Sequence, residues 1–178
     1  MIGTATLSDD RVYRYSLERR WARGATVSFI GLNPSTADEQ ADDATIRRCV
    51  RFARDWGYAH LVMLNLFALR ATQPNVLWEG PRHPVGPEND ETILRYVRAS
   101  EVTVLCWGAT EAPVKRETFG RPLFPVYQRA CEVATLLRAE GCAVHCLGTT
   151  QHRHPRHPVR LRADTQLVEF PLVRYPRV

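Results

Sequence analysis

The residues best suited to chemistry lie in four segments that are far apart in the chain. Asn33 stands in the loop Gly31-Leu-Asn-Pro-Ser35, Asn65 ends an apolar run, and Trp107 ends another. Residues 152–162 follow a fourth apolar run and are rich in histidine and arginine. An asparagine amide can orient a water molecule or bind the edge of a base. A histidine can donate a hydrogen bond to a developing anion, so these residue types fit electrostatic catalysis.

The loop 31–35 combines residues that allow a ligand to approach closely. Gly31 leaves room beside the backbone, and Pro34 fixes the direction of the turn. Ser35 and Thr36 could donate to a phosphate or cap a helix. For Asn33 the alternative to a role at a ligand is that it only caps its own loop.

The segment 152–162 holds three of the six histidines and four arginines. The arginines could bind phosphates, and the alternative is a solvated basic loop. The segment lacks the His-Glu-x-x-His pattern, and the five cysteines form no Cys-x-x-Cys pair. We therefore expect no metal site, and we read the cysteines as reduced thiols.

The elements that must position these residues alternate along the chain. Four short apolar runs, residues 27–32, 61–66, 102–107 and 143–148, are typical of buried parallel strands. Amphipathic stretches at 43–56, 87–99 and 126–140 predict helices. This alternation predicts an α/β fold with helices on both faces of a parallel sheet, in a single domain spanning residues 1–178.

Ahead of these elements, residues 11–16 alternate polar and apolar side chains and predict an edge strand or hairpin. In open α/β sheets, ligands bind outside the carboxyl ends of the strands. Because each chemically suited segment follows one of the four runs, we expect them to meet at one cleft.

The composition limits the classes of binding partner and the cellular location that we expect for the protein. The formal charge of +5 favours an anionic partner such as nucleic acid, and the alternative is a mildly basic enzyme. No apolar run approaches about 18 residues, and the N-terminus lacks a signal-peptide pattern. We expect a cytoplasmic monomer with no membrane contact.

The motifs, taken in order, resemble those of the uracil-DNA glycosylase superfamily. The loop 31–35 is similar to the Gly-Ile-Asn-Pro-Gly motif of mismatch-specific uracil-DNA glycosylases, with Ser35 in place of the last glycine. Residues 65–70 resemble the second-strand motif, Trp107-Gly-Ala109 the third, and His157-Pro-Val-Arg-Leu161 the late His-Pro motif. The stretch 13–167 also resembles an uncharacterised bacterial domain family.

The resemblance implies a three-layer α/β/α fold with a central four-stranded parallel sheet and a pocket for a flipped nucleotide. Asn33 would position the attacking water, and His157, or alternatively His154, would donate to the departing base. Val159 or Leu161 would fill the gap that the base leaves. The expected substrate-binding residues are Gly31, Leu32, Pro34, Ser35, Asn65, Phe67, Trp107 and Gly108, and the expected DNA-binding residues are Arg70, His154, Arg156, Arg160 and Arg162.

The expected function is a monofunctional DNA glycosylase that hydrolyses the N-glycosidic bond of a modified or damaged pyrimidine. One version removes hypermodified cytosine, such as glucosylated cytosine in phage DNA, as an antiphage defence. The single lysine, Lys115, lies in a segment read as an insertion, residues 113–125, so no amine nucleophile and no cofactor is expected. The alternatives are an N-glycosidase acting on free nucleotides or nucleosides, and an inactive nucleic-acid-binding module.

Overall fold

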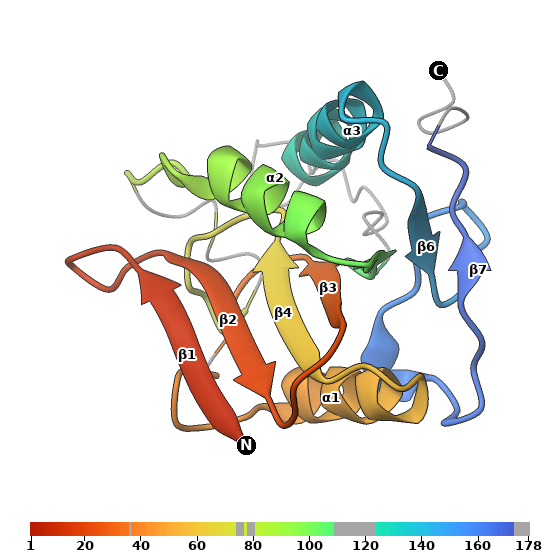
Figure 1. The fold of residues 1–178 in the computed structure, drawn as a ribbon. Helices are drawn as coiled ribbons and strands as arrows, with labels where there is room; N and C mark the ends of the chain where they lie inside the picture. Colours follow the sequence, from red (N-terminus) through yellow and green to blue (C-terminus); the bar gives the residue numbers. More distant parts are fainter. Residues whose placement is uncertain (36, 74–76, 78–80, 109–123, 173–178) are drawn as a thin grey trace.

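The computed structural model describes residues 1–35, 37–73, 77, 81–108 and 124–172. Within these residues, seven strands form one mixed sheet in the order β1-β2-β4-β3-β5-β6-β7 (Figure 1). Helices lie on both sides of the sheet, so the predicted α/β class is confirmed. The strands are β1 (Ile2–Leu7), β2 (Arg14–Arg20), β3 (Thr26–Gly31), β4 (His60–Asn65), β5 (Val102–Leu105), β6 (Val144–Cys146) and β7 (Val168–Glu169).

The four apolar runs form β3, β4, β5 and β6. Strand β3 pairs in parallel with β4 and with β5, and β5 pairs in parallel with β6. In this register Gly31 lies opposite Asn65. Every residue of β4 is buried, as expected for a strand covered on both faces. The carboxyl ends of these strands therefore meet at one edge of the sheet.

The sheet is larger than the four-stranded parallel sheet that the resemblance implies, because antiparallel strands extend it at both ends. The N-terminal segment forms a β1–β2 hairpin, and β2 also pairs antiparallel with β4. The sequence pattern predicted an edge strand or a hairpin from residues 11–16. The hairpin is present at this edge, with β1 as the edge strand and β2 inside the sheet. At the other end, β7 pairs with β6 and was not predicted.

Two hydrophobic clusters cover the two faces. Helix α1 (Ala44–Asp55) packs Cys49 and Phe52 against one face. Helices α2 (Asn89–Ala99) and α3 (Phe124–Ala139) cover the other face, where Ile93 and Ala130 are fully buried. The three helices lie within a few residues of their predicted positions. No helix in the described part of the chain is long and apolar enough to cross a membrane.

A candidate active site at the ends of the parallel strands

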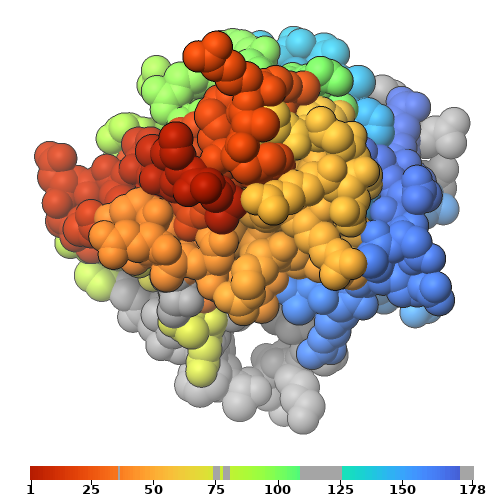
Figure 2. Space-filling view, turned by 60° about the horizontal axis from the view of Figure 1, so that its bottom comes forward, coloured from red at the N-terminus to blue at the C-terminus, as the bar shows by residue number. Residues whose placement is uncertain are grey.

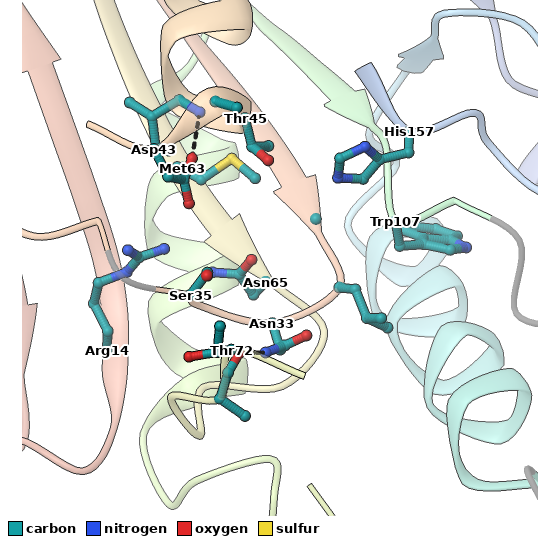
Figure 3. Close-up of a pocket in the computed structure, with 15 residues that line it drawn as sticks. Arg14, Asn33, Ser35, Asp43, Thr45, Met63, Asn65, Thr72, Trp107 and His157 are labelled. Atoms are coloured by element: carbon teal, nitrogen blue, oxygen red, sulfur yellow. Dashed lines mark hydrogen bonds between the residues drawn. The ribbon is translucent and has the colours of Figure 1, made fainter. Parts of the chain in front are cut away.

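A cavity of about 390 Å³ opens at the carboxyl ends of the parallel strands (Figure 3). Asn33 follows β3, Asn65 ends β4, Trp107 follows β5, and His157 lies beyond β6. All four side chains line this one cavity. Its volume falls within the usual range for small-molecule sites, about 300–1,000 Å³.

The Asn33 amide is held by two main-chain carbonyls. Its Nδ2 donates to the carbonyl of Pro34 at 3.0 Å and to that of Ala71 at 2.7 Å. The Ala71 N–H in turn donates to the Pro34 carbonyl at 2.9 Å. Because Nδ2 is occupied by these two acceptors, Oδ1 is the atom of Asn33 that remains to accept a hydrogen bond from a water or a ligand.

Asn65 forms a polar part of the cavity wall that is almost completely buried. It is 1% exposed, and its Nδ2 has no hydrogen-bond partner among the described residues. A Cβ at Gly31 would lie 2.6 Å from Met63 Cε and 3.1 Å from Asn65 Oδ1, so only glycine leaves this wall undisturbed. An unpartnered buried donor in a cavity indicates a place for a ligand acceptor.

His157 projects its imidazole into the cavity from the segment after β6 (Figure 3). Its Nδ1 accepts a hydrogen bond from the Val159 N–H at 3.4 Å. In the neutral ring the proton is therefore on Nε2. Burial lowers the pKa of His157; nearby Asp43 opposes this shift, and Arg160 adds to it. The geometry thus provides a neutral N–H donor near pH 7.

Gly108 supports the His157 segment from the end of β5. Its backbone lies in the left-handed region, with a φ of +85°, and its N–H donates to the Pro155 carbonyl at 2.9 Å. A Cβ at Gly108 would lie 3.3 Å from His157 Cβ. Glycine here lets the histidine segment pass close to the end of β5.

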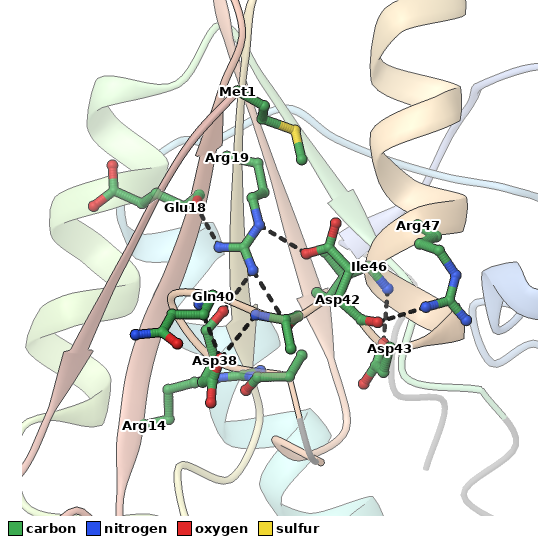
Figure 4. Close-up of polar contacts among 12 residues, drawn as sticks. Met1, Arg14, Glu18, Arg19, Asp38, Gln40, Asp42, Asp43, Ile46 and Arg47 are labelled. Carbon is green, nitrogen blue, oxygen red and sulfur yellow. Dashed lines mark hydrogen bonds and ion pairs between the residues drawn. The ribbon is translucent and has the colours of Figure 1, made fainter.

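The loop 31–43 is fastened by arginines of β2 (Figure 4). Arg19 Nε donates to Asp42 Oδ1 at 2.7 Å, and its other nitrogens donate to the carbonyls of Glu18 and Asp38. Arg14 donates to the carbonyl of Ala37 at 2.6 Å. These two buried side chains satisfy the carbonyl groups of Ala37 and Asp38, which lie outside the strands of the sheet.

Both expected catalytic residues, Asn33 and His157, line the cavity. Five of the eight expected substrate-binding residues line it with them, namely Gly31, Leu32, Ser35, Asn65 and Trp107. Phe67 does not line it, because the chain turns inward after β4 and buries this ring in the α2–α3 core. Pro34 is buried within the loop, where its carbonyl accepts the bonds described above. Gly108 supports His157 rather than lining the cavity.

Three of the five expected DNA-binding residues lie on the surface. Arg156, Arg160 and Arg162 are exposed, and Arg162 pairs with Asp164 at 3.1 Å. Figure 2 shows this C-terminal segment (blue) beside α1 (orange to gold). Arg70 is half-buried, and its guanidinium donates to the Arg11 carbonyl at 3.4 Å.

Two further expectations in this segment are corrected. His154 is 2% exposed and meets the Tyr127 ring edge-on with centroids 6.1 Å apart, so it does not line the cavity. Leu161 packs against the α1 core, whereas Val159 is exposed. Lys115 and residues 113–123 of the expected insertion lie outside the described residues.

Several cavity residues carried no prediction of a site role. Arg14 comes from β2, Met63 from β4, and Asp43 and Thr45 from the start of α1. Asp43 also caps α1, because its Oδ1 accepts from the Ile46 N–H at 2.8 Å. Across the residues that the structure describes, no cluster of three or more His, Cys, Asp or Glu side chains could hold a metal ion.

Comparison with known proteins gives one match. Residues 14–159 match the model of a family described as a protein of unknown function, DUF1643. No curated protein and no solved structure matches the chain. The match agrees with the resemblance to an uncharacterised domain family, and the link to uracil-DNA glycosylases stays a prediction.

Proposed function

Because the chain belongs to the DUF1643 family, whose description carries no activity, we propose its function from the cavity. We propose a monofunctional DNA glycosylase that hydrolyses the N-glycosidic bond of a nucleotide extruded from DNA. The single observation that carries this proposal is that Asn33 and His157, 124 positions apart, line the same cavity.

The two side chains offer complementary chemistry for this hydrolysis. Oδ1 of Asn33 accepts a hydrogen bond from the attacking water, because Nδ2 is held by the carbonyls of Pro34 and Ala71. Nε2 of His157 donates to the base as it gains negative charge, because Nδ1 is the acceptor for Val159. A donor placed where charge develops lowers the barrier of such a reaction.

The reaction balances without a cofactor. The bond between C1′ of the sugar and the base nitrogen breaks, and its electron pair leaves with the base. The water oxygen bonds to C1′, one of its protons completes the departing base, and the sugar keeps the hydroxyl. Asn65 Nδ2 is available to donate to an acceptor on the bound nucleotide.

The proposed targets are altered pyrimidines, including the glucosylated cytosine of phage DNA. A cavity of about 390 Å³ supports a target larger than a plain base. The exposed Arg156 and Arg160 flank His157 and would bind the phosphates on either side of the extruded nucleotide.

The test is base release from defined duplexes. The protein is incubated with duplexes that carry uracil, hydroxymethylcytosine or its glucoside, and alkali-labile abasic sites and free bases are measured. Release from at least one duplex, lost in Asn33→Ala and in His157→Ala, is expected. His152→Ala serves as the control, because His152 is an exposed histidine of the same segment and does not line the cavity. Binding without release would instead select an inactive nucleic-acid-binding module.

A second candidate is the same hydrolysis on a free nucleotide, which the buried Arg14 in the cavity favours. A gel shift at increasing salt separates the two candidates. Several phosphate contacts on DNA give a steep fall of affinity with salt, whereas a mononucleotide enzyme shows no specific DNA complex.

A further inference from the structure

One part of the cavity, formed by Arg14 with Ser35 and Thr72, has no role in the proposed hydrolysis. In Figure 3 Arg14 lies on the opposite side of the cavity from Trp107 and His157, with Asn33 and Asn65 between them. A ligand that reaches both sides would have one group beside Arg14 and another beside His157.

Arg14 differs from the other buried arginines in having no carboxylate partner. It is 2% exposed, donates to the Ala37 carbonyl, and forms no ion pair among the described residues, where its Nε also lacks a partner. Arg19 and Arg129 are equally buried, but they pair with Asp42 and Asp90 respectively. A buried charge without a partner is costly, so an arginine kept in this state suggests a partner that arrives with the ligand.

The surroundings of Arg14 leave its charge in place. Burial lowers the pKa of Arg14 to about 10, so the guanidinium is protonated at neutral pH. Asp43 and Asp38 favour its charged form, and Arg70 and Arg19 disfavour it. The Asp43 carboxylate caps α1, and the Asp38 carboxylate accepts the N–H groups of its own loop.

The neighbouring polar groups match one kind of anion. Ser35 and Thr72 place hydroxyl groups on the cavity wall, and Asn65 adds an amide donor without a partner. A guanidinium with hydroxyl and amide donors suits the several oxygens of a phosphate better than a single neutral acceptor. Arg14 and Asn65 are both more than nine-tenths buried, so these two donors belong to the interior of the cavity, whereas Ser35 is half-buried and Thr72 is exposed.

We propose that Arg14, Ser35 and Thr72 form a phosphate subsite, and that the substrate is a nucleotide whose phosphate binds there. The subsite deepens the proposed function and rests on it in one respect, the use of this cavity for the substrate. The phosphate comes either from the extruded nucleotide of a DNA strand or from a free nucleotide.

The test is a binding measurement that requires no bond cleavage. Affinities for deoxycytidine monophosphate, deoxycytidine and inorganic phosphate are measured by calorimetry with the full chain. The monophosphate is expected to bind about 10-fold to 100-fold more tightly than the nucleoside, as charge-assisted hydrogen bonds predict. Arg14→Gln is expected to remove this preference, and Arg51→Gln, at an exposed arginine of α1 outside the cavity lining, is the matched control that keeps it.

A second pair of variants covers the case in which Arg14→Gln does not fold. Ser35→Ala and Thr72→Val each remove one hydroxyl and are expected to reduce the preference for the monophosphate several-fold. Equal affinity of the wild-type protein for monophosphate and nucleoside would overturn the subsite, and so would an unchanged preference in both hydroxyl variants.

Competition identifies the source of the phosphate. If deoxycytidine monophosphate displaces a DNA strand carrying an extruded pyrimidine, the DNA phosphate uses the subsite; binding of the monophosphate with no DNA complex identifies a free nucleotide. Failure of base release with the phosphate preference intact rejects the glycosylase and keeps the subsite. Base release without the preference rejects the subsite alone.

Discussion

The two walls of the cavity are built in different ways. The wall formed by loop 31–43 is held by side-chain hydrogen bonds. The buried Arg14 and Arg19 donate to the carbonyls of Ala37 and Asp38, and Asn33 donates to the carbonyl of Pro34. The wall formed by residues 149–162 is held mainly by main-chain bonds, such as those from Gly108 to Pro155 and from Thr150 to His154, and most of its side chains are exposed.

This difference separates two tasks. A wall fixed by buried polar groups keeps the water acceptor of Asn33 in one orientation, so the residues that anchor this wall, such as Arg19, should act mainly on stability. A wall tied by its backbone leaves the His157 imidazole partly open to solvent, so its residues should act mainly on the reaction. The variants that follow test whether the anchors of loop 31–43 affect mainly the free energy of unfolding and the segment that carries His157 affects mainly the reaction rate.

The largest expected effect lies in the loop wall. Arg19→Met removes the buried partner of Asp42 and the bonds to the loop carbonyls of Asp38 and Ala41. We expect the free energy of unfolding to fall by about 3 kcal/mol, the lower end for breaking a buried pair, because Asp42 keeps some contact with solvent. Urea denaturation measures this change. A loss below about 1 kcal/mol, the value typical of a surface pair, would show that the loop does not depend on this anchor.

The second-largest effect is expected for His157, in the wall formed by residues 149–162, and it concerns the rate of base release. On a duplex that the wild-type protein cleaves, His157→Ala is expected to slow single-turnover base release by about 10²–10³-fold, the usual effect of losing one well-placed donor. The free energy of unfolding should change by no more than about 0.5 kcal/mol, because the side chain is not part of the core. A variant that unfolds easily, or one that releases base at the wild-type rate, contradicts the division between the walls.

A smaller effect is expected for Asp43, because this residue both caps α1 and raises the pKa of His157. Asparagine caps a helix as well as aspartate does, so Asp43→Asn should leave stability nearly unchanged. The carboxylate raises the pKa of His157, so its removal lowers this pKa further. Because the neutral imidazole is the proposed donor, base release falls as the pH falls through the pKa of His157, below its ordinary value of 6.5. The acid limb of the pH–rate profile should therefore move to lower pH in the variant; a shift to higher pH would contradict the role of His157.

The smallest effect is expected for the exposed ion pair at the end of the segment that carries His157. Arg162 and Asp164 are largely solvated, so Arg162→Ala should change the free energy of unfolding by less than about 1 kcal/mol. Chemical denaturation beside Arg19→Met provides the comparison. A loss as large as that of Arg19→Met would show that this wall, too, depends on its side chains.

Much of the central architecture was predictable because it follows from continuous apolar runs. The four runs form β3 to β6. Because ligands bind at the carboxyl ends of such strands, the sequence predicts that Asn33, Asn65 and His157 share one cleft, and all three line the same cavity. Helix α1 was equally predictable, since the amphipathic stretch 43–56 contains it.

Arg14 could not be found in the same way. In a segment that alternates polar and apolar residues, an arginine normally faces solvent, and the pattern of 11–16 therefore read as an edge strand. The structure covers β2 with β1 on one side, β4 on the other, and the loop 31–43 over its polar residues. Burial of Arg14 depends on these long-range contacts, which no local pattern reports.

Phe67 was predicted to line the cavity, but the structure buries it in the core. Its place just beyond β4 and its resemblance to a superfamily motif pointed to the cavity, yet its N–H bonds to the Leu32 carbonyl at 3.0 Å and the ring enters the core. Which way a chain turns after a strand is decided by the packing of both loops, and the sequence of one loop does not contain that information.

The two hydrogen bonds that hold the Asn33 side chain restrict which residues position 33 can accept. An aspartate has the same shape but brings two acceptor oxygens, one of which would face the carbonyls of Pro34 and Ala71 at distances now occupied by N–H donors. The resulting repulsion between lone pairs would open the loop or force the carboxyl group to keep a proton. A neutral amide is therefore built into this wall, and a carboxylate base at this position would require a different course for residues 71–73.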